Sequence, residues 1–351
     1  MPKDSISKNG LNNAAMLSAH RRSRVAVALL TLFSLTFPFT VLRGQQDSQN
    51  PAEAIRRSVD RVNVGVIVTD AHGQFVEGLQ REDFSVLDNS VAQPLTDFAA
   101  VEEPAQVLLL IEAGPAVYFL EASHVQAAYA LLNGLSAGDR VAVVKYAEAP
   151  QAITDFSADK SIAGSALEQL RFNLGFGSLN LSSSLATVLD WLKKVQGKRT
   201  IVLLSTGVDT SPESQAQALL QTLKITDVRI LAVSLAGELR NPQPAGKKKK
   251  SSADKPVESS LQFDQADRIL KEISEAAGGR AYFPRNAGEF SAAYAEIAQL
   301  VRHEYSLAFA PPARDNTLHA IEVRVRPANT AAPMLANYRV DHRRAYLAPA
   351  P

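Results

Sequence analysis

Several short patterns in the chain could carry chemistry, and each has a structural requirement. Gly134–Gly138 matches the G-x-S-x-G pattern of a serine nucleophile elbow, which needs a strand before the serine and a helix after it. Here an expected helix precedes and an expected strand follows, so the pattern predicts a plain helix-to-strand loop. Gly175–Gly177 lacks the third glycine of a dinucleotide-binding loop, and the chain holds no G-x-x-x-x-G-K-[ST] phosphate loop.

The other reactive side chains lack the partners that catalysis requires. Ser182–Ser184 have no assignable histidine base, and the surroundings of Asp83 and Asp88 predict solvated turn residues rather than an acid–base pair. The absence of cysteine and the scatter of the six histidines exclude disulfides, thiol nucleophiles and an HExxH zinc site. The sequence therefore predicts a protein that is not an enzyme, and an uncharacterised α/β enzyme is the least favoured alternative.

The composition is that of a globular chain. Of its 351 residues, 46% are hydrophobic and 21% are charged, which is close to ordinary usage. The formal net charge of +1 depends on residues 1–44, which hold six basic residues and one acidic residue; the rest of the chain carries −4. A mildly acidic remainder argues against a nucleic-acid partner.

The first 44 residues have the layout of an export signal. Three arginines within Arg21–Arg24 precede an uncharged run of 18 residues, Val25–Leu42. We interpret residues 1–44 as a signal peptide, with Gln45 starting a mature periplasmic or extracellular protein. The run is at the lower edge of what spans a bilayer, so an uncleaved N-terminal anchor, with membrane contact, is the alternative.

Strands and helices alternate between residues 105 and 303. Continuous apolar strands separated by amphipathic helices predict an α/β fold: a doubly wound, mostly parallel sheet covered on both faces. A polar Lys/Ser/Pro segment, 241–260, predicts a disordered surface loop. The expected strands are Val107–Ile111, Arg140–Tyr146, Ala149–Phe156, Thr200–Ser205, Val228–Ser234 and Arg280–Phe283. The expected helices are Tyr118–Leu132, Ala158–Phe172, Leu181–Val195, Pro212–Lys224, Asp264–Ala277 and Ala287–Arg302.

The segments before and after this α/β region have a different pattern. Short strands separated by turns predict small antiparallel β flanks, one over 60–103 and one over 304–346. The pattern leaves open whether these flanks form a separate domain or extend the central sheet.

This organisation resembles the von Willebrand factor A fold, and in particular a bacterial (acidobacterial) von Willebrand factor A-related domain family. Three stretches carry the resemblance: Val62–Phe98, with its V-T-D-x-x-G and D-N-x-x-x-Q elements; Ile273–Pro284, with its Gly–Gly pair; and Tyr305–Pro327, with Y-x-L-x-F-x-P. Together with the α/β core they span Val62–Tyr346. The resemblance implies a protein-binding module rather than an enzyme.

The resemblance also implies where a metal site would lie. A-type domains of this family hold Mg²⁺ with a D-x-S-x-S motif after the first core strand, a Thr before a central helix and an Asp after the next strand. This sequence departs from the motif at every position, so we expect no metal; weak Mg²⁺ or Ca²⁺ binding is the alternative. The corresponding residues are Glu112, Gly114, Ala116, Leu179 (or Ser178 with a one-residue shift) and Thr206.

We therefore expect an exported, non-enzymatic, adhesion- or scaffold-type module that binds an unidentified protein partner without a cofactor. Its expected contact surface is the set of loops at the carboxyl ends of the core strands. The candidate partner-binding residues are Glu112, Pro115, Tyr118, Phe176, Ser178, Asn180, Thr206 and Asp209. The alternative is a divalent-metal-dependent adhesion module that uses Glu112, Ser178 and a rotated Asp209.

Overall fold

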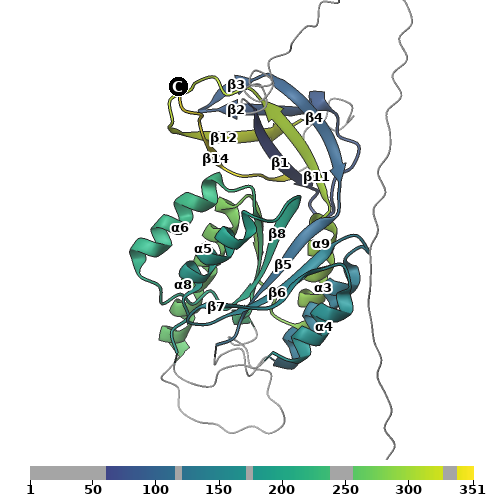
Figure 1. Cartoon of the computed structure of the whole chain (residues 1–351), viewed down its shortest axis with the longest axis vertical. Coiled ribbons are helices and arrows are strands. Elements are labelled where there is room, and N and C mark those ends of the chain that lie inside the picture. The colour runs from purple at the N-terminus through teal and green to yellow at the C-terminus, as the bar shows by residue number, and fades with distance from the viewer. Residues whose placement is uncertain (1–60, 115–120, 171–176, 238–255, 327–337) are drawn as a thin grey trace, which may run out of the picture. The chain divides into compact units, whose positions relative to one another are not determined.

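The computed structural model describes residues 61–114, 121–170, 177–237, 256–326 and 338–351 (Figure 1). Residues Asn50–Pro351 form one compact unit. The expected signal segment, 1–44, lies outside the described residues. Among the residues that are described, no helix is long and apolar enough to cross a membrane.

The centre of this unit is a six-stranded sheet with the order β10-β9-β8-β5-β6-β7. Five strands run parallel, and β7 pairs antiparallel with β6 at one edge. The inner strands are buried apolar runs, as a sheet covered on both faces requires. The strands are β5 (Ala105–Glu112), β6 (Arg140–Tyr146), β7 (Pro150–Ser157), β8 (Lys198–Ser205), β9 (Arg229–Ser234) and β10 (Arg280–Tyr282).

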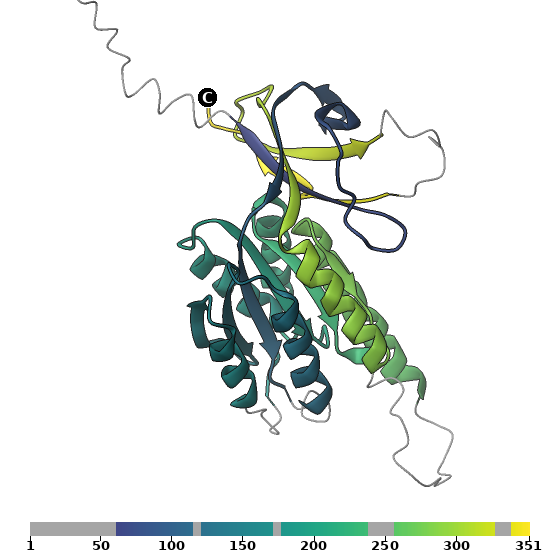
Figure 2. The same cartoon turned by 90° about the vertical axis from the view of Figure 1, so that its right-hand side faces the viewer.

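Helices cover both faces of the sheet (Figures 1 and 2). Successive residues of β5 point to opposite faces: Leu109 packs in the core of the α3, α4 and α9 side, and Leu110 in the core of the α5, α6 and α8 side. This confirms the expected doubly wound α/β fold. The helices are α3 (Glu121–Gly134), α4 (Lys160–Glu168), α5 (Leu181–Leu192), α6 (Glu213–Ile225), α8 (Pro256–Ala276) and α9 (Ala287–Leu300).

The expected β flanks come together from both ends of the chain. One antiparallel sheet has the order β13-β1-β11-β4, and a second has the order β14-β12-β2-β3. Both sheets therefore combine early and late strands, and one apolar cluster fills the space between them. The strands are β1 (Val62–Thr69), β2 (Phe84–Asp88), β3 (Val91–Gln93), β4 (Leu95–Glu102), β11 (His303–Phe309), β12 (Leu318–Val325), β13 (Arg339–Asp341) and β14 (Ala345–Leu347). A short 3-10 helix, η1 (Arg81–Asp83), precedes β2.

Buried arginines join the β strands to the central sheet. Arg280 on β10 donates from Nε to the Asp341 carboxylate at 2.8 Å, and from a terminal nitrogen to the Thr69 hydroxyl at 3.0 Å. Arg229 on β9 contacts Glu304 on β11 at 3.0 Å. These charged groups are satisfied across the contact, which makes them costly to remove singly.

One helix boundary differs from the sequence expectation. α8 begins at Pro256, eight residues before the expected start at Asp264, so the last five residues of the expected loop 241–260 are helical. Proline suits the first turn of a helix, where its missing N–H costs nothing. Residues 241–255 of that loop lie outside the described residues.

Candidate functional site

The strands β5, β6 and β8 end side by side, at Glu112, Tyr146 and Ser205. We call this end of the central sheet, with the loops that follow these strands, the carboxyl edge. Glu112, the last residue of β5, is in register with Tyr146, the last residue of β6. On its other side, Ile111 pairs with Leu204, so Ser205 and Thr206 follow directly beside Glu112. Open α/β sheets place ligands at this edge. The structure therefore brings Glu112 and Thr206 together, as the sequence resemblance implied.

Glu112 is the centre of a closed hydrogen-bond network. Its side chain is 0% exposed. The backbone N–H of Thr206 donates to Glu112 Oε2 at 2.7 Å, and the Thr206 hydroxyl donates to the same oxygen at 2.8 Å. The Ser205 hydroxyl donates to it at 3.1 Å, and the Tyr146 hydroxyl lies 2.7 Å from the Ser205 oxygen. Most of these contacts converge on Oε2, whereas Oε1 accepts from the Thr206 hydroxyl at 3.0 Å.

Burial governs the protonation of this group. Removal from water raises the pKa of Glu112 above its usual value, and the hydrogen bonds from Thr206, Ser205 and Tyr146 oppose that rise only in part. Burial also raises the pKa of Tyr146 well above 10, with a further contribution from the charge of Glu112. Tyr146 therefore stays protonated and serves as a donor. Glu112 therefore ends β5 as a buried group and not as a solvated one.

A leucine fills the space beside this carboxylate. A Cβ atom added to Gly114 would lie 2.7 Å from Leu179 Cδ2, closer than carbon atoms approach. Leu179 is buried, and its loop is held to the next one because its N–H donates to Thr210 Oγ1 at 2.9 Å and Thr210 N–H donates back to its carbonyl at 2.7 Å. A side chain at position 114 and this leucine are therefore mutually exclusive without rearrangement.

Asp209 is directed to the start of α5. Its carboxylate accepts hydrogen bonds from the N–H of Ser182 at 3.2 Å, from the Ser182 hydroxyl, and from the N–H of Ser211 at 2.9 Å. A carboxylate at a helix N-terminus satisfies free N–H groups and complements the helix dipole. The geometry gives Asp209 a structural role at the start of α5.

The donor set does not match a divalent cation. Mg²⁺ requires an octahedral shell of oxygen ligands at about 2.0–2.1 Å, and Ca²⁺ requires six to eight oxygens. Here Gly114 and Leu179 present carbon where the family motif has hydroxyl oxygens, and Thr206 and Ser205 already donate to Glu112 Oε2. Within the described residues no three acidic or histidine side chains gather in a way that could hold a metal ion.

The expected contact surface needs a correction. Glu112 and Thr206 are both buried, so neither presents atoms to a partner at this edge. Ser178 is exposed, and Asn180 and Asp209 are half-buried. Sequence reasoning did not single out Val208, which is 37% exposed beside them. Four of the expected residues lie outside the described parts of the chain: Pro115, Ala116, Tyr118 and Phe176.

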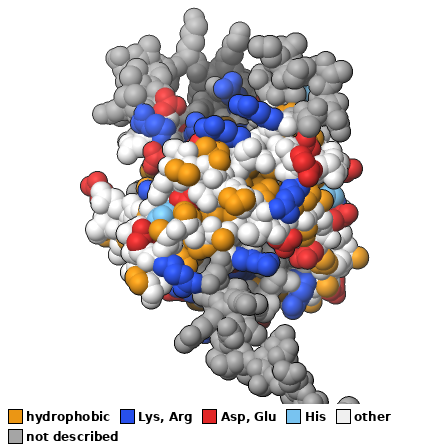
Figure 3. Space-filling view, turned by 90° about the horizontal axis from the view of Figure 1, so that it is seen from above, with side chains coloured by type: hydrophobic (Ala, Val, Ile, Leu, Met, Phe, Trp, Pro, Cys, Tyr) orange, Lys and Arg blue, Asp and Glu red, His pale blue; other side chains and the backbone are white. Residues whose placement is uncertain are grey.

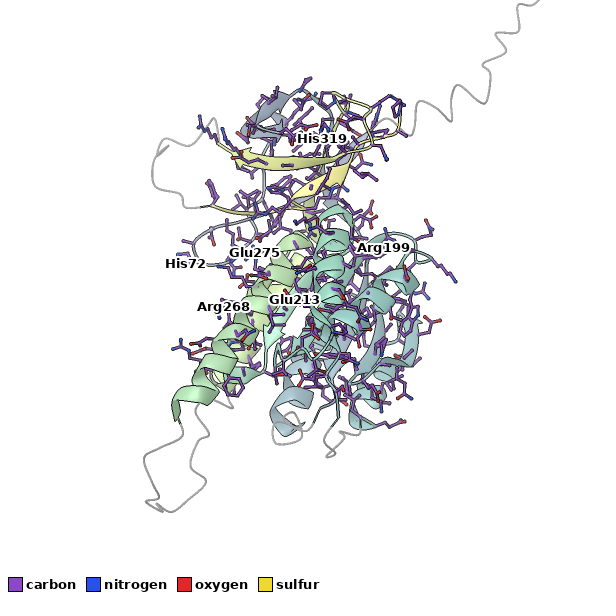
Figure 4. The ribbon with its side chains drawn as sticks, turned by 90° about the vertical axis from the view of Figure 1, so that its left-hand side faces the viewer. His72, Arg199, Glu213, Arg268, Glu275 and His319 are labelled. Carbon is purple, nitrogen blue, oxygen red and sulfur yellow. The ribbon has the colours of Figure 1, made fainter. Side chains whose placement is uncertain are left out.

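A second polar network, among the β strands, was not foreseen. Asp88 is buried and not a solvated turn residue: it accepts from the Tyr346 hydroxyl at 2.5 Å and lies 2.7 Å from His319 Nδ1. His319, labelled in Figure 4, also contacts Asp315 at 3.2 Å through Nε2. These partners are 231 and 258 positions from Asp88 along the chain, so no local pattern could reveal them.

The comparisons with known proteins bear on the fold. No protein-family model matches the sequence. No curated protein matches it either. Solved structures that are similar include a von Willebrand factor type A protein from Catenulispora acidiphila (11% identity, 77% of this chain and 76% of that chain, TM-score 0.44). They also include the von Willebrand factor domain of the type V pili tip protein Mfa5 from Porphyromonas gingivalis (13%, 57% and 96%, 0.40) and BatB from Bacteroides thetaiotaomicron (12%, 56% and 98%, 0.38). These are likenesses of fold alone.

Proposed function

We propose that the chain is an exported, non-enzymatic, protein-binding module of the adhesion or scaffold type, with a von Willebrand A-like fold and a degenerate site that works without a metal. The proposal rests on the contacts that protein groups make at the carboxyl edge, where a metal ion would bind in the family motif. Protein hydrogen bonds occupy both sides of the Glu112 carboxylate, and Leu179 packs onto Gly114. Hydrogen bonds and an apolar contact replace the cation that would otherwise hold these loops.

Binding without a cation has a different physical basis. In metal-dependent A-type domains the ion offers a coordination position to a carboxylate of the partner. Without it, affinity rests on shape, hydrogen bonds and apolar contact. The exposed groups at this edge suit that basis: Val208 is apolar, and Ser178 and Thr210 carry hydroxyls. We propose these residues, with Asn180 and Asp209 at the rim, as the partner contact.

Three further observations support a protein that is not an enzyme, has no nucleic-acid partner and is exported. The serines near this edge have no histidine beside them among the described residues, and Ser182 is committed to Asp209. The face seen in Figure 3 carries basic, acidic and apolar side chains interspersed, unlike the continuous basic field of a nucleic-acid surface. Residues 1–44 supply the layout of an export signal, in a periplasmic or extracellular protein.

The experiment is affinity capture of the exported proteins of the source organism on the immobilised full chain, with and without EDTA. Val208→Asp places a charge in the proposed contact. Val91→Asp is the matched control, because Val91 is 63% exposed on β3, outside the loops at the carboxyl edge. We expect the same proteins to be retained by the wild type in EDTA and by Val91→Asp, and lost from Val208→Asp.

Elution of the partner by EDTA would contradict the proposal and favour the metal-dependent alternative with Glu112, Ser178 and Asp209. Equal retention by both aspartate variants would contradict the proposed contact surface. Turnover of a substrate by the purified chain, lost on substitution at the carboxyl edge, would place the protein among enzymes instead.

A further inference from the structure

A cationic cavity lies at the opposite, amino end of the central sheet. It has a volume of about 200 Å³, whereas a single water needs only about 10–15 Å³. Its wall is formed by the starts of β8 and β9, by β1 and β11, and by the segment after β13. The charged residues that line it are Lys198, Arg199, Asp227, Arg229, Glu304 and Arg343. Arg199 is labelled in Figure 4.

Two of the cations are already neutralised by the protein. Arg229 donates to Glu304 at 3.0 Å and to the carbonyl oxygens of Gly65 and Gly278 at 3.2 Å each. Arg199 is paired with Asp227, whose side chain faces largely into solvent. Lys198 shares Glu304 with Arg229, and its Nζ lies 3.6 Å from Glu304 Oε2. Arg343 donates to the Asn63 carbonyl oxygen at 2.6 Å and forms no ion pair within the described residues.

The cavity also has more hydrogen-bond donors than acceptors. The side chain of Lys198 is 6% exposed, and its Nζ lies 3.6 Å from Glu304 Oε2, beyond hydrogen-bond distance. Within the described residues this buried ammonium has no hydrogen-bond partner. The Nε atoms of Arg343 and Arg199 are likewise buried and unpaired in the described structure. Buried donors without acceptors are unfavourable, so an acceptor-rich ligand fits here.

We propose that this cavity binds a phosphate-class oxyanion, held by Lys198 and Arg343. A tetrahedral phosphate supplies four acceptor oxygens, and its charge of about −2 balances the net charge of +2 that four cations and two carboxylates leave on the cavity wall. The Arg199 Nε and the Thr226 hydroxyl, both on the cavity wall, offer further donors at the rim.

The protonation of Lys198 is consistent with an anion at this place. Burial lowers the pKa of its ammonium, Glu304 opposes this decrease, and the positive charge of Arg229 adds to it, so that the pKa is about 8. A neighbouring anion favours the charged form and raises the pKa again. The site is separate from the carboxyl edge, so this inference does not depend on the proposed partner contact.

The experiment measures the thermal midpoint of the full chain against increasing inorganic phosphate, with sodium chloride at the same ionic strength as the reference. A second series uses glycerol phosphate, a phosphomonoester, and tighter binding in one series identifies the free ion or the ester as the better ligand. We expect a saturable rise on the order of 5 °C at 100 times the dissociation constant.

The variants locate the ligand. Lys198→Gln removes the central donor, and Lys194→Gln is the matched control on an exposed lysine nearby. We expect Lys198→Gln to weaken phosphate binding at least tenfold and Lys194→Gln to leave it unchanged. Because Lys198→Gln could alter folding, Arg343→Gln is measured too, and binding is judged from the phosphate-dependent rise alone. No rise with either ligand, or equal rises in all variants, would overturn the proposal and leave the cavity to water.

Discussion

Substitution of Glu112 tests whether its network holds the carboxyl edge together. In Glu112→Ala the N–H of Thr206 stays buried and loses its acceptor at 2.7 Å. An unpaired buried donor costs about 1–3 kcal/mol, and a backbone N–H cannot rotate toward another partner. The void left by the side chain adds to this cost, whereas relief of the buried charge reduces it. We expect a net loss of about 2–3 kcal/mol at neutral pH.

Glu112→Gln is the matched variant, because its amide oxygen can still accept from Thr206. We expect its free energy of unfolding to stay within about 1 kcal/mol of the wild type. Urea unfolding followed by far-UV circular dichroism measures both variants. Equal stability of the alanine and glutamine variants would refute a supporting role for the acceptor.

The pH dependence gives an independent check of the same residue. Burial raises the pKa of Glu112 in the folded state. Its contribution to stability is therefore fully present below the unfolded value and is lost as the pH rises through the folded value. The wild type should lose stability relative to Glu112→Gln over that range. A difference between the two that does not change with pH would contradict the burial of an ionisable carboxyl group.

Three further predictions concern other parts of the chain. The hydrogen bond that His319 donates to Asp315, followed by the one that it donates to Asp88, raises the pKa of His319. The contribution of His319 to stability should therefore be present below about pH 6.5 and lost as the pH rises through the folded value. Thermal melting against pH should show a flatter profile for His319→Gln than for the wild type. Asp341→Asn removes the charge of the more buried of the two carboxylates that pair with Arg280. It should cost about 3 kcal/mol in urea unfolding, at the lower end for a broken buried pair because Glu296 remains; a loss below 1 kcal/mol would contradict the importance of this pair. The mature protein should begin at Gln45 by intact mass, and an intact residue 1 would indicate an anchor.

The sequence predicted the strands of the central sheet best, because each inner strand contains a run of buried apolar residues. The apolar runs of β5, β8 and β9 follow from residues that face helices on both sides, and they were predictable from hydrophobicity alone. The start of α8 was predicted too late. Its first turn, with Glu258, Ser259 and Ser260, continues the polar composition of the preceding segment, although Pro256 marks a suitable first position.

The candidate site was only partly predictable. The resemblance located Glu112, Leu179 and Thr206 at one edge, but sequence spacing could not show that the carboxylate is buried or that leucine packs onto Gly114. Those facts depend on how loops from three strands meet. The prediction that Asp88 is a solvated turn residue was wrong for the same reason. Its partners come from β12 and β14, far from Asp88 in the sequence.

The most direct test of the metal-free site is the thermal midpoint of the full chain in EDTA and in saturating Mg²⁺, Ca²⁺ or Mn²⁺. The positive control restores the family ligands with Glu112→Asp, Gly114→Ser, Ala116→Ser, Leu179→Thr and Thr206→Asp. A bound ion at 100 times its dissociation constant contributes about 2.7 kcal/mol, or several degrees. We expect no shift in the wild type and a shift in the restored variant. A saturable shift in the wild type, lost in Glu112→Ala, would contradict the account and establish a metal-dependent site.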